Sequence, residues 1–128
     1  MTAPSRCRVL VVEDETMVAM LVEDMVQDFG SEVVGPAARI DEALRLARNA
    51  ELDAAILDIN VGGTVIFPVA DVLRARGIPL IFSTGYGASD LAPRFLECPT
   101  LRKPFTYEAL REALRDALAD RPCHTEAA

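Results

Sequence analysis

The sequence predicts an α/β domain built around a parallel β-sheet. Short runs of strand-forming residues alternate with longer stretches of helical period, which is the pattern of repeated βα units. Five such units are visible within 128 residues, a length typical of one domain. Hydrophobic residues make up 51% of the chain, enough to build a core. We therefore expect a single compact domain with five strands.

Each predicted strand corresponds to a short apolar run. The runs lie near residues 8–12, 32–35, 53–58, 79–83 and 99–102. All five are expected to lie in one sheet with the helices packed against it.

The first two helices are predicted from apolar spacing and from their end residues. The first should bury one face on the sheet, because apolar residues recur at a spacing of four. These residues are Met17, Leu21, Met25 and Phe29, with Val18, Val22 and Val26 beside them. The second is expected to begin with Asp41 as its N-cap and to end near Ala50.

The remaining helical stretches differ in how regular they are. One runs from about Ile66 to Gly77, with Pro68 tolerated because it lies in the first turn. The last follows Thr106 and extends over residues 107–119. Between them, Pro93 interrupts the stretch from residue 88 to 96, so we expect a short or mobile fourth helix there.

The net charge, the cysteines and the lengths of the apolar runs bear on the partners and on the cellular location. The formal net charge of -7 argues against nucleic acid or an anionic membrane surface. Cys7, Cys98 and Cys123 are odd in number, widely spaced and without a C-x-x-C pair, so we expect reduced thiols. No apolar run approaches the length of a membrane span, and no signal peptide is evident. We therefore expect a cytoplasmic protein.

Lys103 is the only lysine in the chain, whereas arginine occurs at every other basic position. A lysine delivers a compact point charge through a narrow opening, which the broad guanidinium of arginine cannot do. An acidic partner for Lys103 is therefore expected. The candidates are Glu13 and Asp14, after the first strand, and Asp58, at the end of the third.

Several polar residues follow strands that should open on one edge of the sheet. They are Glu13, Asp14, Asp58, Thr84 and Lys103. In parallel α/β sheets, ligands bind at this edge, where the strand order reverses. Because clustered carboxylates repel one another, a divalent cation is expected, and hard oxygen ligands favour magnesium (Mg²⁺).

Four motifs in order along the chain carry a resemblance to a known family. They are Val11-Val12-Glu13-Asp14, Leu57-Asp58-Ile59-Asn60, Phe82-Ser83-Thr84-Gly85 and Lys103-Pro104-Phe105. Over about residues 7–120 the chain resembles the receiver domain of two-component response regulators, of the stand-alone type and of the subgroup with a Phe-Ala-Thr-Gly-Tyr-type motif. The resemblance implies a flavodoxin-like (βα)5 fold, doubly wound, with strand order 2-1-3-4-5 and helices on both faces.

The resemblance also implies a role for each residue at the sheet edge. Asp58 would accept a phosphoryl group from a phosphohistidine on a histidine kinase or a phosphotransfer protein. The implied Mg²⁺ ligands are Glu13, Asp14, Asp58 and the backbone carbonyl of Asn60. Lys103 would pair with Asp58 at rest and with a phosphoryl oxygen afterwards, and Thr84 would then donate its hydroxyl to the new phosphate.

Further positions bear on switching and on the lifetime of the phosphoryl group. Thr100 occupies the position where the family usually carries a switching aromatic residue. Tyr86, two residues past Thr84, is expected to influence access of hydrolytic water, and residues 85–96 are expected to become ordered on phosphorylation. Gly62 and Gly63 predict a mobile loop beside Asp58.

We expect three segments: an N-terminal extension at 1–6, the receiver domain at 7–120 and a flexible tail at 121–128. No output domain is visible, so the chain would act on a downstream protein or serve as a phosphate sink, which the sequence does not separate. It would not be an enzyme beyond its own phosphorylation and dephosphorylation. It is expected to be a monomer or weak dimer.

Two other functions remain open from the residues. Asp58-Ile59-Asn60 faintly resembles the nucleophile motif of haloacid-dehalogenase-like phosphatases, but those need an acid where Asn60 stands. A binding module with a vestigial site is the other alternative. Only a receiver should gain one phosphoryl group on Asp58 from a small phosphodonor with Mg²⁺.

Overall fold

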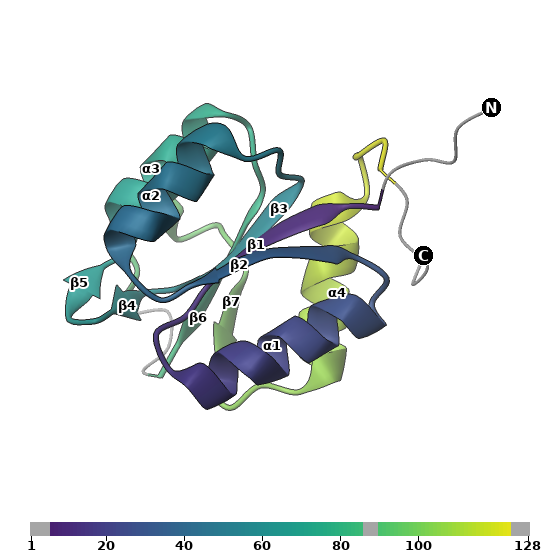
Figure 1. Ribbon diagram of the computed structural model, residues 1–128, viewed down its shortest axis with the longest axis horizontal. Coiled ribbons are helices and arrows are strands. Elements are labelled where there is room, and N and C mark those ends of the chain that lie inside the picture. Colours follow the sequence, from purple (N-terminus) through teal and green to yellow (C-terminus); the bar gives the residue numbers. More distant parts are fainter. Residues whose placement is uncertain (1–5, 86–89, 124–128) are drawn as a thin grey trace.

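The computed structural model describes residues 6–85 and 90–123. In this part of the chain, helices α1 and α4 cover one face of a parallel five-stranded sheet, and α2 and α3 cover the other (Figure 1). The strands are β1 (Arg8–Val12), β2 (Glu32–Ala37), β3 (Ala54–Asp58), β6 (Leu80–Thr84) and β7 (Thr100–Arg102). Their spatial order is β2-β1-β3-β6-β7. Since β6 and β7 are the fourth and fifth strands of this sheet, the predicted order 2-1-3-4-5 is confirmed.

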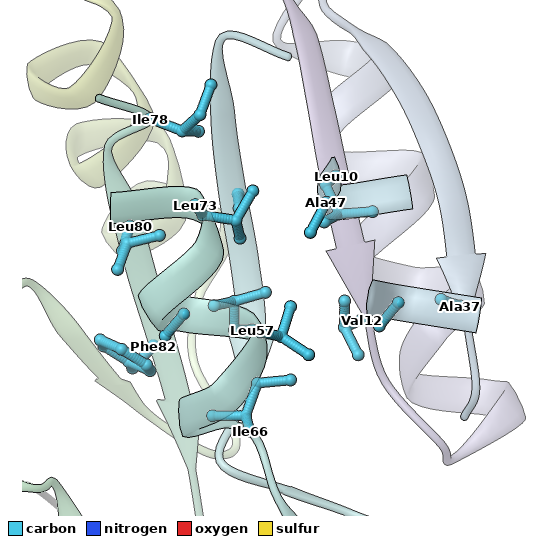
Figure 2. Packing of buried hydrophobic residues seen from close by; sticks show 14 of the residues in the cluster. Leu10, Val12, Ala37, Ala47, Leu57, Ile66, Leu73, Ile78, Leu80 and Phe82 are labelled. Atoms are coloured by element: carbon cyan, nitrogen blue, oxygen red, sulfur yellow. The ribbon is translucent and has the colours of Figure 1, made fainter. Parts of the chain in front are cut away.

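The sheet buries side chains on both faces, as its near-continuous apolar strands require. Alternate residues of a strand point to opposite faces, so Leu10 and Val12 of β1 face one layer of helices and Val9 and Val11 face the other. Figure 2 shows the first of these layers, where Leu57 of β3 and Phe82 of β6 pack toward Leu73 of α3.

Helix α1 (Thr16–Asp28) buries one face, and of the predicted row of residues four apart only the later members, Met25 and Phe29, pack on the core. The buried residues are Ala19, Val22, Val26 and, just past the helix, Phe29. Met17 and Leu21 are 84% and 53% exposed. The helix therefore carries a second apolar surface, and this one is largely exposed.

Helix α2 (Ile40–Asn49) corrects the predicted N-cap. The N-cap residue is Arg39, and Asp41 lies inside the first turn. There the Asp41 carboxylate accepts a hydrogen bond from the Arg39 guanidinium at 3.1 Å and one from the Glu42 amide at 2.9 Å. An acidic residue in the first turn also stabilises a helix, through the helix dipole, and a sequence pattern does not separate this position from a cap.

Helices α3 (Phe67–Ala75) and α4 (Tyr107–Leu118) begin where the sequence predicted. Pro68 lies in the first turn of α3, where no intrahelical N–H is needed. The Thr106 hydroxyl caps α4 by accepting a hydrogen bond from the Ala109 amide at 3.1 Å. Leu110, Leu114 and Leu118 are buried, as the spacing predicted.

Between β6 and β7 the described residues contain no α-helix of ordinary length. They form the short 3-10 helix η2 (Pro93–Phe95), which agrees with the predicted short fourth helix. Within the predicted 85–96 switch segment, residues 86–89, which include Tyr86, lie outside the described residues.

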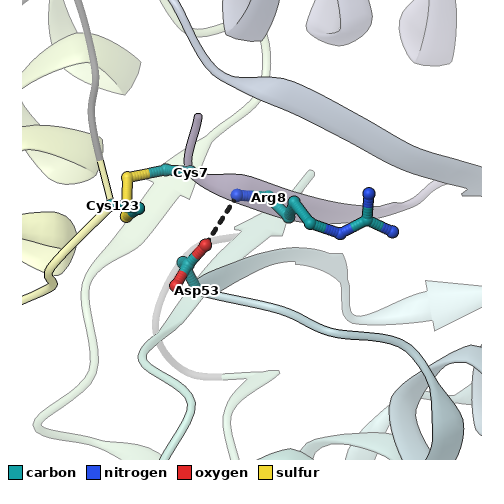
Figure 3. Close-up of a disulfide and its surroundings, with 4 residues drawn as sticks. All are labelled: Cys7, Arg8, Asp53 and Cys123. Atoms are coloured by element: carbon teal, nitrogen blue, oxygen red, sulfur yellow. Dashed lines mark hydrogen bonds between the residues drawn. A yellow bond between two sulfur atoms is a disulfide. The ribbon is translucent and has the colours of Figure 1, made fainter. Parts of the chain in front are cut away.

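The cysteine prediction was wrong for two of the three residues. Cys7 and Cys123 form a disulfide across a sequence separation of 116, and Cys98 is a free thiol (Figure 3). Cys7 precedes β1 and is fully buried, and Cys123 follows α4. The fold brings these two positions together, which sequence spacing alone cannot reveal.

The end of the described chain is also tied to the domain by hydrogen bonds. Arg121 donates to the carbonyl of Gly77 at 2.6 Å, beside the end of α3. Residues 121–123 therefore contact the domain, whereas the remainder of the predicted tail, residues 124–128, lies outside the described residues. The division into three segments stays a prediction.

Across residues 6–85 and 90–123, none of the helices combines the length and the apolar composition that crossing a membrane would need.

We expect the disulfide to contribute about 2–4 kcal/mol to the free energy of unfolding, because it closes a long loop and restricts the unfolded chain. Urea unfolding of the parent and of Cys123→Ala, each with and without dithiothreitol, measures this contribution. The variant should be less stable without reductant, and the two proteins should coincide in its presence. Cys98→Ala, the matched control, should keep the parent's response to reductant. A parent whose stability ignores reductant would contradict the prediction.

Candidate functional site

The carboxyl ends of the central strands deliver the predicted polar residues to one edge of the sheet. The registers pair Val12 with Leu57, Asp58 with Ser83, and Thr84 with Arg102, so these strands end at nearly the same level. The structure brings together all five residues predicted there: Glu13, Asp14, Asp58, Thr84 and Lys103. A cleft of about 610 Å³ opens at this edge.

Side chains from separate strand ends line the cleft. They include Asp14, Asp58, Asn60, Thr84, Asp90 and Lys103. Glu13 is only 4% exposed and does not line the cleft, whereas Asp58 is 7% exposed and lines it. The cleft therefore exposes one largely buried carboxylate to an incoming group.

Lys103 pairs with two carboxylates at once. Its ammonium lies 2.6 Å from Glu13 Oε1 and 3.1 Å from Asp58 Oδ2. We predicted Asp58 as the resting partner of Lys103, and the structure adds the shorter contact to Glu13. The expected acidic partner of the single lysine is thus a pair of carboxylates.

The pKa values of Glu13 and Lys103 are both raised, for different physical reasons. Burial raises the pKa of Glu13 to about 7, although its hydrogen bond with Lys103 opposes the shift. Burial alone would lower the pKa of Lys103, but its hydrogen bonds to Glu13 and Asp58 outweigh that effect and raise it. Lys103 therefore stays charged and supplies the positive charge next to Asp58.

The glycine-rich segment beside Asp58 forms a hairpin, where a mobile loop was expected. Strands β4 (Asn60–Val61) and β5 (Thr64–Val65) pair in antiparallel fashion around Gly62 and Gly63. Both glycines have positive φ, +60° and +84°, which a two-residue hairpin turn requires. The Gly62 amide donates to Asp14 Oδ2 at 2.9 Å and so ties the hairpin to the acidic cluster.

The acidic cluster has a donor set that suits a hard divalent cation. Glu13, Asp14 and Asp58 offer carboxylate oxygens that all lie within 4.8 Å of one another. Oxygen donors in small number match Mg²⁺, which also keeps several waters. A cation there would offset the repulsion that remains after Lys103 has neutralised one charge.

Thr84 has a partner that sequence reasoning missed. Its hydroxyl donates to Asp90 Oδ2 at 3.0 Å. Asp90 follows a glycine-rich stretch and ends no strand, so no pattern pointed to it. Thr100, another predicted switch position, donates its hydroxyl to the Cys98 carbonyl at 3.3 Å. Tyr86, predicted to affect the phosphoryl lifetime, is not among the described residues.

The sequence profile of the family described as "Response regulator receiver domain" matches residues 9–115. Among curated proteins, the chain is similar to the phyllosphere-induced regulator PhyR of Methylorubrum extorquens, with 30% identity over 92% of this chain and 46% of that protein. It is also similar to the transcriptional regulatory protein PdtaR of Mycobacterium tuberculosis, with 28% identity over 88% of this chain and 57% of that protein. The chain thus spans about half the length of these relatives.

Among solved structures, the fold matches the solution structure of SdrG from Sphingomonas melonis Fr1, with 39% identity and a TM-score of 0.77. That alignment covers 93% of this chain and 99% of SdrG. A solution structure of SdrG from Pseudomonas melonis Fr1 in a BeF3-activated conformation matches with 37% identity and a TM-score of 0.75, over 89% of this chain and 98% of that one.

Replacing Lys103 by glutamine should destabilise the fold in the absence of divalent cations. We expect a loss of about 2 kcal/mol in the free energy of unfolding, less than the roughly 3–5 kcal/mol for breaking a buried pair, because Glu13 can take up a proton. Urea unfolding with a chelator, and then with Mg²⁺, measures the effect. Mg²⁺ should restore part of the lost stability, since a cation replaces the missing charge.

Arg102→Gln is the matched control, because Arg102 is the neighbouring cation and is exposed. This variant should keep the parent's stability in both solutions. A Lys103→Gln protein as stable as the parent in chelator would show that the ammonium does not hold the carboxylates together.

Proposed function

Because the chain belongs to the response regulator receiver domain family, we propose that it accepts a phosphoryl group on Asp58 from a phosphohistidine in two-component signalling. The donor would be a histidine kinase or a histidine phosphotransfer protein. The observation that carries this proposal is the Asp58 carboxylate, which lines a cleft between a cluster of acidic ligands and the Lys103 ammonium.

In the proposed reaction, an Asp58 carboxylate oxygen attacks phosphorus as a nucleophile. The P–N bond of the phosphohistidine breaks, its electron pair returns to the imidazole nitrogen, and an acyl phosphate forms on Asp58. Lys103 is placed to follow this change, because its ammonium already contacts Asp58 Oδ2 and can transfer its hydrogen bond to a phosphoryl oxygen.

Glu13, Asp14 and Asp58 would hold Mg²⁺, together with the backbone carbonyl of Asn60. When bound, the cation neutralises charge on the phosphoryl oxygens and helps to align the transfer. The hairpin of β4 and β5 orients this ligand set, since the Gly62 amide fixes Asp14 and the Asn60 amide donates to Asp58 Oδ1 at 3.4 Å.

The hydrolase alternative gains no support from the residue two positions after Asp58. Asn60 stands there, and its side-chain carbonyl accepts a hydrogen bond from the Gly63 amide at 3.0 Å, which closes the hairpin. An amide in that role offers no acid for protonating a leaving group. Retention of the acidic pair, Asp58, Thr84 and Lys103 likewise favours a working phosphoacceptor over a vestigial site.

We infer that the donor docks on α1. Met17, Met20 and Leu21 are 84%, 60% and 53% exposed and share one face of the helix, which begins beside Asp14. Leu21 also lines an apolar hollow whose rim includes Lys103 and Phe105. A donor helix lying on this face would bring its phosphohistidine over the cleft.

Three properties remain predictions from the sequence: a cytoplasmic location, action as a monomer or weak dimer, and absence of enzymatic activity beyond the chain's own phosphorylation and dephosphorylation. The choice between a downstream protein target and a phosphate sink also stays open.

The proposed function predicts one phosphoryl adduct on the parent after incubation with acetyl phosphate and Mg²⁺. Intact-mass spectrometry should detect it, and Asp58→Asn should remain unmodified because an amide oxygen is a poor nucleophile. Chelation of Mg²⁺ should abolish the adduct. Asp41→Asn, which removes an exposed carboxylate on α2, is the matched control and should be modified like the parent. An unmodified parent, also with a phosphorylated kinase as donor, would favour the vestigial binding module.

Leu21→Gln should slow phosphoryl transfer from a phosphohistidine protein about tenfold, which is the effect of losing an ordinary interface anchor. The rate with acetyl phosphate should not change, because a small donor needs no docking surface. Leu96→Gln is the matched control, since Leu96 is 58% exposed and lies on another part of the molecule. Equal losses for the two variants, or a loss with acetyl phosphate, would exclude docking on α1.

A further inference from the structure

Asp90 forms a hydrogen bond with Thr84, the residue whose hydroxyl would bind the phosphoryl group in the proposed function. It accepts the Thr84 hydroxyl at 3.0 Å, and both residues line the cleft beside Asp58. Thr84 is 2% exposed, at the carboxyl end of β6, whereas Asp90 is exposed. The contact thus joins the buried sheet edge to the segment that leads through η2 to β7.

We propose that Asp90 is a positioning residue, which acts through Thr84 to stabilise the unphosphorylated state. The inference rests on the proposed function, because it concerns the hydroxyl that would bind the phosphoryl group. A hydroxyl has one proton and donates one strong hydrogen bond at a time. Thr84 therefore has to leave Asp90 before it can donate to a phosphoryl oxygen.

The chain after Asp90 is anchored to α3 through Arg94 and Phe95, which keeps Asp90 near Thr84. Arg94 donates two hydrogen bonds to Asp71, at 2.9 and 2.8 Å, and its guanidinium lies 4.9 Å from the centre of the Phe95 ring. Phe95 is fully buried and stacks on Phe67 with ring centroids 5.6 Å apart. The Arg94 hydrogen bonds also lower the pKa of Asp71, so this ion pair persists.

Phosphorylation would weaken the Thr84–Asp90 contact for two reasons. The phosphoryl oxygens compete with Asp90 for the same proton. They also add about two negative charges to a cleft that the Asp90 carboxylate already lines. Asp90 would then lose the hydrogen bond from Thr84 and would be repelled by the negative phosphoryl group. We therefore expect Asp90 to move away from β6.

A residue that stabilises the resting state lowers the fraction of molecules ready to bind a phosphoryl group, and therefore the apparent affinity for its mimic. The mimic used is beryllofluoride with Mg²⁺, followed by ¹⁹F NMR titration. Asp90→Ala should bind it about tenfold more tightly than the parent, the change expected for losing one hydrogen bond with a charged acceptor. Asp90→Asn keeps a side-chain oxygen that can accept from Thr84, although a neutral one, so its gain should be clearly smaller than that of Asp90→Ala.

Two comparisons separate this mechanism from its alternatives. In a Thr84→Val background, Asp90→Ala should gain much less than in the parent, because the hydroxyl is already absent and only the negative charge is removed. Equal gains for Asp90→Ala and Asp90→Asn would assign the effect to charge alone and overturn the inference. So would an undiminished gain with Thr84→Val, or an Asp90→Ala protein that binds like the parent. A parent that binds no beryllofluoride with Mg²⁺ would instead contradict the proposed function itself.

Discussion

The ammonium of Lys103, shared between Glu13 and Asp58, is the interaction on which the acidic edge of the sheet depends. Both carboxylates are almost excluded from water, and two such charges about 4 Å apart repel by roughly 4 kcal/mol at an effective dielectric near 20. Lys103 lies 2.6 Å from one and 3.1 Å from the other, so a single cation offsets the repulsion. The planar guanidinium of arginine is broader and binds a single carboxylate through two parallel hydrogen bonds. This gives a physical reason for lysine at this position.

The sheet makes this arrangement possible, because β1, β3, β6 and β7 end at nearly the same level and each brings functional residues to that edge. β3 contributes Asp58, β6 contributes Thr84, and Lys103 directly follows β7. A shift of one residue in any register would turn that side chain to the other face. The apolar layers against α1 and α4, and against α2 and α3, fix the registers. The buried core therefore determines the geometry of the cleft, although its residues take no part in the chemistry.

The sequence predicted the features that depend on local periodicity and missed those that depend on tertiary proximity. Strand positions and the cap at Thr106 follow from nearest neighbours along the chain, and the meeting of Asp58 with Lys103 follows from parallel topology. The disulfide of Cys7 with Cys123 joins positions 116 residues apart, and Asp90, which contacts Thr84, belongs to no predicted strand end. Periodicity carries no information on such pairs. For α1, it identified an apolar helix but did not show that Leu21 faces outward, because this helix has apolar residues on two faces.

The described residues that lead from Asp90 to β7 link the fixed cleft to a surface that the proposal requires to move. These residues are anchored at Phe95 and reach the cleft at Asp90. Converting a surface from about 1:99 to 99:1 between two states requires roughly 5.5 kcal/mol of differential stabilisation. One hydrogen bond with a charged acceptor supplies about 1.5–3 kcal/mol. The Thr84–Asp90 contact can therefore set the resting balance, but the new contacts of Lys103, Thr84 and the metal ligands to the phosphoryl group must supply the rest.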